Sequence, residues 1–258
     1  MFDLRLRSLR RDRACRQGAA LFLHHRAFDD SIERLSIVRR SFKSALLIGC
    51  PDPRWKSRLE QIAGSVDVVD PGECFAAQAG GTAMVEDQMD LEVGGYDLCV
   101  AIGTLDTLND LPQALLRIRL ALAPNTFFIG AMAGGDTLPR LREAMRAADR
   151  ELGSASPHVH PRIDPSALAG LLSSAGFVDP VVDVDRVRVS YSALSDLVRD
   201  LRAMGATNVL LDRSPRPLSR KAAAAAATAF AADDLGEKAV ERFDILHFAG
   251  WTPSDPQG

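Results

Sequence analysis

A glycine and an acidic residue that close two apolar segments are the residues of this chain best placed to do chemistry. Gly49 follows the apolar segment 44–48, Asp70 follows the apolar segment 66–69, and residues 54–63 between them have a helical pattern. A parallel strand–helix–strand unit brings both strand ends to one edge of a sheet, where an acidic residue can bind ribose hydroxyls. The pattern therefore predicts a nucleotide-type pocket formed by Gly49 and Asp70.

The loop after Gly49 departs from the usual cofactor-binding pattern. Pro51 and Pro53 stand where a phosphate- or cofactor-cradling turn has Gly-X-Gly. Proline has no backbone N–H and cannot adopt a positive φ, so neither position can donate to a ligand. Two readings stay open for each residue: Asp70 binds ribose or caps the turn at 71–73, and Gly49 approaches a cofactor or gives a tight exit from its strand.

Length and composition indicate a folded protein with a full hydrophobic core. The chain has 258 residues, of which 47% are hydrophobic, and this excludes a disordered or fibrous protein. A net charge of -3 gives no electrostatic case for nucleic-acid binding. We expect a single domain over 1–258, with a helical cap at 1–40, a cofactor-binding half at 44–135 and a substrate or partner half at 136–258.

Arginines are concentrated at the start of the chain. The first sixteen residues hold six of them, Arg5, Arg7, Arg10, Arg11, Arg13 and Arg16, against Asp3 and Asp12. Such a run is typical of a transit peptide, of a basic helix that makes a peripheral contact with an anionic membrane surface, or of a solvated helix face. The sequence leaves these three interpretations open.

The four cysteines and the apolar segments bear on the compartment. Cys15, Cys50, Cys74 and Cys99 show no C-x-x-C spacing, which predicts buried free thiols in a reducing compartment and disfavours a disulfide or a zinc site. No apolar run approaches the roughly 18 residues that span a bilayer, and no signal-peptide pattern follows the basic start. We therefore expect a cytoplasmic protein without a transmembrane segment.

Apolar strands alternate with helical segments along the chain. Strands are predicted at 44–48, 66–69, 97–102 and 126–132, with a half-wet edge strand at 181–189 and a final strand at 243–249. Helices are predicted at 8–38, 54–63, 72–79, from Asp110 to Leu122, at 134–151, 164–176, 192–204 and 219–232. This order predicts a doubly wound α/β fold.

Six motifs carry a resemblance to a known family. They are Tyr96–Val100, Leu108–Pro112, Gly134–Leu138, Pro180–Asp185, Arg199–Asn208 and Gly250–Pro253. In these segments the chain resembles class I S-adenosylmethionine (SAM)-dependent methyltransferases. The resembling branch holds the complex I assembly factor that hydroxylates an arginine and is related to the biotin-pathway malonyl-carrier-protein methyltransferase. The likeness begins at Phe2, which favours a basic start that belongs to the folded protein and a bacterial cytoplasmic location.

The resemblance implies a fold, a cofactor and a set of site residues. It implies a Rossmann-like, seven-stranded, mostly parallel sheet with an antiparallel last strand and a helical N-terminal cap, and it implies SAM as the cofactor. The implied cofactor-binding residues are Gly49, Asp70, Glu86, Asp87 and Ile102. Glu86 and Asp87 would face the adenine amine or else be plain surface acids.

The family pattern is incomplete in two regions of the chain. Leu47 replaces an acid of the first motif, beside the two prolines, and Leu105–Thr107 replaces a Leu-His-Trp-like run. Three functions stay open: a SAM-dependent methyltransferase acting on a protein, an arginine hydroxylase on the same scaffold, and a non-catalytic assembly factor with a decayed SAM pocket. No catalytic base can be named.

Residues of the second half are candidates for binding a substrate or a partner, such as a respiratory-complex subunit. Asp136 is predicted to cap a helix or to contact a substrate. Arg199 and Arg202 share a helix face that suits an acidic or peptide partner, with ion pairs to neighbouring acids as the competing interpretation, and Asn208 ends the same motif. His158-Val159-His160 is a weak metal pattern, and no metal site is predicted.

Overall fold

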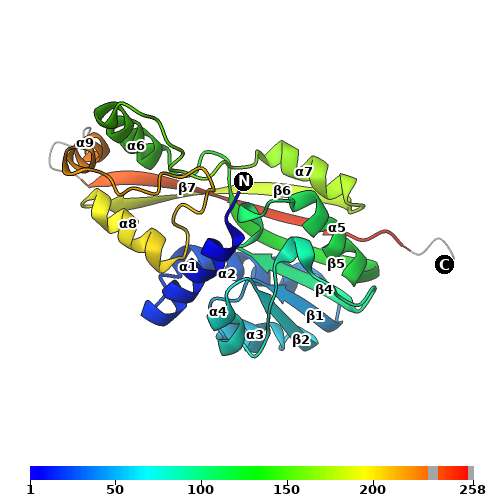
Figure 1. The fold of residues 1–258 in the computed structure, drawn as a ribbon. Helices are drawn as coiled ribbons and strands as arrows, with labels where there is room; N and C mark the ends of the chain where they lie inside the picture. The colour runs from blue at the N-terminus through cyan, green and yellow to red at the C-terminus, as the bar shows by residue number, and fades with distance from the viewer. Residues whose placement is uncertain (232–237, 255–258) are drawn as a thin grey trace.

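A seven-stranded sheet with the strand order β3-β2-β1-β4-β5-β7-β6 forms the centre of the protein (Figure 1). The computed structural model describes residues 1–231 and 238–254. The strands are β1 (Phe42–Ile48), β2 (Ala63–Asp70), β3 (Thr82–Ala83), β4 (Tyr96–Ile102), β5 (Leu122–Gly134), β6 (Val178–Tyr191) and β7 (Ala239–Trp251). The helices are α1 (Leu4–Gln17), α2 (Phe22–Ile37), α3 (Arg54–Leu59), α4 (Glu73–Gln78), α5 (Leu111–Ala121), α6 (Pro139–Leu152), α7 (Pro165–Ser174), α8 (Leu194–Ala203) and α9 (Arg220–Ala231).

The pairing of the strands confirms the predicted topology. β1 to β5 pair in parallel, whereas β7 lies antiparallel between β5 and β6. The central strands are buried on both faces because they are continuous apolar runs, while β6 largely alternates half-buried and exposed residues as an edge strand does. The carboxyl ends of β1, β2 and β4 therefore meet at one edge of the sheet, which we name the cofactor edge.

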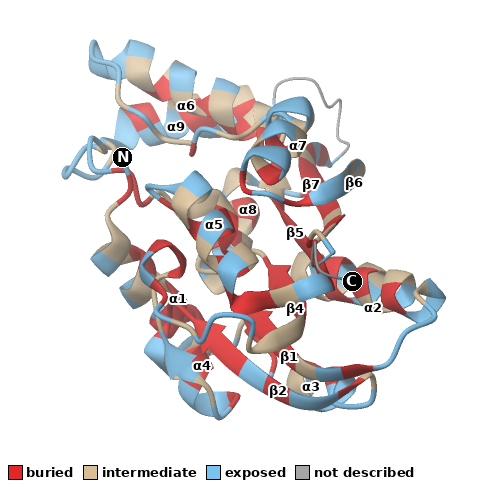
Figure 2. Cartoon of the chain, turned by 90° about the vertical axis from the view of Figure 1, so that its right-hand side faces the viewer, coloured by how far each residue is buried: buried red, intermediate tan, exposed pale blue. Residues whose placement is uncertain are grey.

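Apolar side chains fill both faces of the sheet, and buried residues are concentrated there (Figure 2). Phe28 of α2 and Trp55 of α3 pack on one face, and Leu115 of α5 and Leu168 of α7 pack on the other. The far ends of β6 and β7 carry a third cluster, in which Phe243 packs with α6, α8 and α9 (Figure 1). This cluster joins the end of β6 and the start of β7 to the three helices.

The N-terminal cap consists of two helices, so the single helix predicted over 8–38 is wrong. The Asp3 side chain accepts a hydrogen bond from the Leu6 N–H at 2.9 Å and starts α1, and Gly18, with φ of 89°, ends it. α1 contacts α4 and α8, whereas α2 contacts β4, β5 and β7. The break at Gly18 thus lets α1 turn away from the sheet and lie over α4.

Other boundaries differ from the sequence prediction by a few residues. α6 begins at Pro139 and not at 134, because β5 continues to Gly134 and Leu138 adopts a left-handed φ of 63° before the helix. The predicted caps Asp110 and Asp164 are confirmed by their hydrogen bonds to backbone N–H groups. α9 matches its prediction apart from its ends, and the predicted last residue, Ala232, lies outside the described residues. Within 1–231 and 238–254, no helix combines the length and the apolarity needed to cross a bilayer.

Candidate cofactor site closed by the first helix

Gly49 lies at the carboxyl end of β1, where the chain turns sharply between β2 and β4. Its φ is +80°, and a Cβ built on it would lie 2.3 Å from the carbonyl oxygen of Ile102 at the end of β4. Glycine is therefore required by the packing of neighbouring strand ends. This geometry accounts for Gly49 without any ligand.

Asp70 ends β2 beside Gly49 and is fully buried. Its Oδ2 accepts hydrogen bonds from the Cys50 N–H at 2.9 Å and from Arg11 Nη2 at 2.6 Å. Its Oδ1 accepts from the Gly72 N–H at 2.8 Å and from Arg11 Nε at 2.9 Å. The bond to Gly72 closes the turn that leads into α4, and the bidentate pair joins the carboxylate to α1. Each carboxylate oxygen thus already has two donors.

Glu86 is held in the same way by a second arginine of α1. It is fully buried, and its two oxygens accept hydrogen bonds from Arg7 Nη1 and Nη2, both at 2.8 Å. Arg7 Nη2 also donates to the Thr104 carbonyl oxygen at 2.6 Å. The neighbouring Asp87 turns away and accepts a hydrogen bond from the Asp110 N–H at 3.3 Å. The two acids therefore face different elements.

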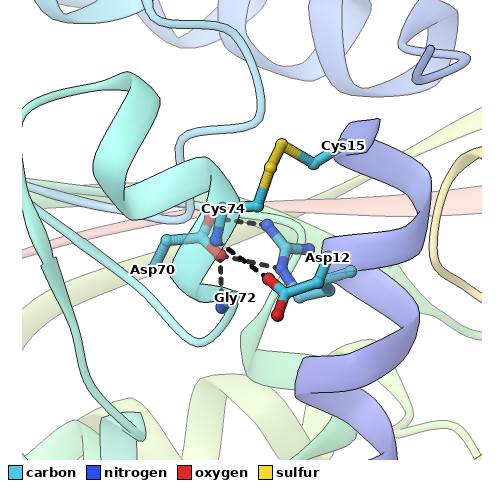
Figure 3. The surroundings of a disulfide bond; sticks show 6 residues. Asp12, Cys15, Asp70, Gly72 and Cys74 are labelled. Atoms are coloured by element: carbon cyan, nitrogen blue, oxygen red, sulfur yellow. Dashed lines mark hydrogen bonds and ion pairs between the residues drawn. A yellow bond between two sulfur atoms is a disulfide. The ribbon is translucent and has the colours of Figure 1, made fainter. Parts of the chain in front are cut away.

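α1 is fastened to α4 by a disulfide and by a capping contact (Figure 3). Cys15 is bonded to Cys74, with their Cα atoms 6.2 Å apart. One turn earlier, the Asp12 carboxylate accepts a hydrogen bond from the Cys74 N–H at 2.9 Å, at the start of α4. Because Arg7, Arg11 and Cys15 recur at intervals of four residues, one face of α1 presents all three side chains to the cofactor edge.

Electrostatics favour the charged form of Arg11 in spite of its burial. Burial by itself would lower the pKa of Arg11, but the charge and hydrogen bonds of Asp70, supported by Glu86, raise it above its usual value. Arg7 and Arg11 expose only 3% and 5% of their surface. A buried charge of this kind is tolerated only with a partner of opposite sign, so α1 and the two acids depend on each other.

Two expectations from the sequence are corrected by this arrangement. The interpretation of the arginine run as a solvated helix face holds for Arg5, Arg13 and Arg16, which are exposed. It does not hold for Arg7 and Arg11, which are buried. The prediction of buried free thiols is confirmed for Cys50 and Cys99. It was wrong for Cys15 and Cys74, which form a disulfide. The four-residue spacing of Arg7, Arg11 and Cys15 indicates that they share one helix face, but it does not distinguish a buried face from a solvated one.

The residues at this edge, as placed, do not fit the ribose of SAM. Both oxygens of Asp70 are saturated by donors, and a Cβ on Gly72 would lie 2.9 Å from the Arg11 Cβ, so α1 packs directly on the turn. A cavity of about 100 Å³ lies nearby, between α2, α8 and the ends of β4 and β5. Gly103, Asp106 and Arg162 line it, whereas Gly49 and the two paired acids do not. Ile102 also lines it, so among the predicted cofactor residues the open space borders the end of β4 and not the paired acids.

The predicted partner residues occupy several different sites. Asp136 is exposed and pairs with Arg242 of β7, while Leu138 holds the cap position of α6, so the prediction of a cap was wrong. Arg199 forms an ion pair with Asp196 at 3.0 Å on α8, as the competing interpretation stated.

Arg202 and Asn208 line the same groove but have different roles. Arg202 is exposed at the edge of a groove that also contains Arg10 and Arg13 of α1. Asn208 instead supports the backbone, because it donates to the Pro157 carbonyl oxygen at 2.7 Å and accepts from the Leu210 N–H at 2.9 Å. Within this groove, Arg202 thus offers an exposed charge, whereas Asn208 is engaged by the backbone of the adjoining loop.

The two histidines of the H-x-H pattern have separate structural partners. His158 Nε2 lies 2.8 Å from an Asp149 carboxylate oxygen, and His160 Nε2 accepts a hydrogen bond from the Val209 N–H at 2.9 Å. In the described part of the chain, no group of three or more His, Cys, Asp and Glu side chains is placed to hold a metal ion. His160 also stacks edge-on against Phe2, with ring centroids 5.4 Å apart, and so supports the start of α1.

Comparisons with known proteins agree with the fold and its resemblance. No family model matches the chain. Among solved structures, the YcgJ protein of Bacillus subtilis has a TM-score of 0.62 at 10% identity, over 90% of this chain and all of that one. A Haemonchus contortus phosphoethanolamine N-methyltransferase 2 has a TM-score of 0.52 at 15% identity, over 88% of this chain and 52% of that one. These two similarities show the fold.

Sequence relatives identify the branch. Arginine-hydroxylase NDUFAF5 of Mus musculus is 30% identical over 272 residues, covering 100% of this chain and 79% of the relative. The protein of the same name from Danio rerio is 31% identical over 87% of this chain and 73% of its own length. A malonyl-[acyl-carrier protein] O-methyltransferase of Xylella fastidiosa is 33% identical over 58% of this chain and 50% of that one. With its seven-stranded topology and these relatives, the chain belongs to the NDUFAF5 arginine-hydroxylase family of the class I methyltransferase superfamily.

Proposed function

We propose that this chain is a protein-binding assembly factor for respiratory complex I, in which helix α1 closes the SAM site. The observation that carries the proposal is the pairing of Arg11 with Asp70 and of Arg7 with Glu86. A ribose needs the Asp70 oxygens, and an adenine amine would need the Glu86 carboxylate, but both acids are occupied by guanidinium groups. The family resemblance supports complex I as the assembly target.

A groove next to α1 supports the binding of an acidic partner. Its floor contains Leu141 of α6 and Leu201 of α8, and its edges carry Arg10, Arg13 and Arg202. Burial, together with repulsion from Arg213, Arg13 and Arg202, lowers the pKa of Arg10. The groove thus combines apolar surface with three positively charged side chains, which is complementary to an acidic amphipathic segment.

Methyl transfer to a protein acceptor is the second candidate. The observation that favours it is the position of Asp70 at the carboxyl end of β2, beside Gly49, where the fold binds nucleosides. In such a transfer the protein aligns the acceptor and excludes water, so the site must first admit the cofactor. In the disulfide-bonded protein, α1 covers the site, and this argues against methyl transfer by that form.

The experiment that separates the two candidates is calorimetric titration of the oxidised protein with SAM and S-adenosylhomocysteine. We expect no binding heat at millimolar ligand, whereas micromolar binding would reject the closed site and favour a methyltransferase. Partner binding is tested with tagged protein and purified peripheral subunits of complex I from the same organism. Arg13→Glu with Arg202→Glu should abolish capture, and Arg39→Glu, at an exposed position between α2 and β1, should not.

A further inference from the structure

α1 lacks the apolar face that usually holds a helix on its protein. Its buried residues are Arg7, Arg11, Asp12 and Ala14, of which three are charged. Buried ion pairs give little net stabilisation, because the attraction between the charges is offset by the loss of their hydration. The buried ion pairs in the middle of α1 therefore determine where the helix lies, but they contribute little net free energy to holding it there.

The two ends of α1 are attached in different ways. At its start, Phe2 forms an antiparallel bridge with Leu210 and packs against Val209. At its end, the attachment is the covalent bond between Cys15 and Cys74. Gly18, which ends α1, is exposed, and a Cβ built on it would have no atom within 4 Å. The packing around Gly18 therefore does not fix the connection between α1 and α2.

The disulfide is placed where it prevents Arg11 from leaving Asp70. Arg11 lies one helical turn before Cys15, a rise of about 6 Å along the axis. Cys74 lies in the first turn of α4, directly after the turn that Asp70 closes through the Gly72 N–H (Figure 3). While the bond is intact, α1 cannot move away from this edge by even one turn.

Of the four cysteines, the disulfide-bonded pair is the more accessible to a reductant. Cys15 and Cys74 are both half-buried at the surface between α1 and α4. Cys50 and Cys99 are buried free thiols, and burial raises the pKa of Cys50 to about 12. Thiol chemistry at neutral pH therefore falls on the Cys15–Cys74 bond, since thiolates are the reactive form.

We propose that the Cys15–Cys74 disulfide is a redox latch, and that its reduction lets a nucleoside displace α1 from Asp70 and Glu86. A dithiol reductant supplies two electrons and two protons: the S–S bond breaks, Cys15 and Cys74 become thiols, and the reductant closes its own disulfide. The ligand class follows from the uncovered groups, because adjacent hydroxyls can donate to Asp70 and an exocyclic amine can donate to Glu86. This inference rests on the closure of the site that the proposed function assumes.

The test compares oxidised protein, protein reduced with dithiothreitol, and the Cys15→Ser variant, each checked for folding by circular dichroism. The probe is S-adenosylhomocysteine in calorimetry, and a second readout is amide hydrogen exchange of residues 4–17. We expect exchange in α1 to rise at least tenfold on reduction and in Cys15→Ser. We expect micromolar binding in both, and its loss when Asp70→Asn is added to Cys15→Ser. Treating Cys15→Ser with dithiothreitol should change nothing further.

Unchanged exchange in the reduced protein, or faster exchange without ligand binding, would overturn the latch and leave the proposed assembly function intact. Binding to the fully oxidised protein would instead overturn the closure, and with it both proposals. Because reduction of the wild-type chain and the Cys15→Ser substitution each remove the S–S bond by a separate route, a folding failure of the variant does not remove the test.

Discussion

Pairing between Arg11 and Asp70 can be measured directly by a double-mutant cycle. Arg11→Met leaves a fully buried carboxylate with only its two backbone donors, and Asp70→Asn leaves a buried guanidinium without its nearest countercharge. Removing one partner of a buried ion pair costs about 3–5 kcal/mol. Removing both leaves neutral groups, so we expect the double variant to lose much less than the sum, with a coupling energy of about 3 kcal/mol.

The assay is urea unfolding of the oxidised protein, followed by circular dichroism at pH 7. The coupling is interpretable when the dependence of unfolding free energy on urea is unchanged among the four proteins. Arg13→Met is the matched control, since Arg13 is exposed on the same helix, and it should change stability by less than about 0.5 kcal/mol. Additivity within about 0.5 kcal/mol would show that the two side chains do not interact and would refute the closed site.

Three further changes test other parts of the structure. Reducing the Cys15–Cys74 bond, whose partners are 59 residues apart, should lower the unfolding free energy by about 4 kcal/mol, as urea midpoints with and without dithiothreitol would show. Burial, with repulsion from Arg162, lowers the pKa of His160 to about 4 from its ordinary 6.5. The unfolded chain thus takes up the proton first, so about 3 kcal/mol of stability, present above pH 6.5, should be lost by pH 4. His160→Gln should remove the part of this pH dependence that comes from His160 and leave the part from His24, whose pKa burial also lowers to about 4. A wild-type profile flat over this range would contradict the prediction. Gly49→Ala should cost about 3 kcal/mol, because it combines a positive φ with overpacking against a backbone oxygen, and a melting temperature equal to the wild type would contradict this.

The sequence predicts the sheet well because each strand has a local signature. The run Leu98–Ile102 is apolar enough to be buried on both faces, and the alternation within 181–189 marks an edge strand, so both were predicted from neighbouring residues alone. Caps such as Asp164 are equally local, because the side chain bonds to a backbone N–H two residues along. Elements of this kind need no knowledge of what lies opposite them.

The closed site could not be predicted because its contacts join distant segments. A row of arginines on α1 has the same sequence pattern when it is solvated and when it is paired, and only the fold brings Arg7 to Glu86. The disulfide likewise joins cysteines without a recognisable spacing, and the use of Asn208 as a backbone support depends on its loop. The position of Asp70 was predictable from the motif, whereas its partner was not.

The bridge between Phe2 and Leu210 has a consequence for the order of events during synthesis. The two bridged residues lie in opposite halves of the chain, and β6 pairs with β7, which follows it in the sequence. Both pairings therefore form only after most of the chain has left the ribosome. We therefore expect the nascent protein to pass through a stage in which the first five strands are assembled and Phe2 has not yet paired with Leu210. The pairing of Phe2 with Leu210 is therefore expected to be a late step in the folding of this chain.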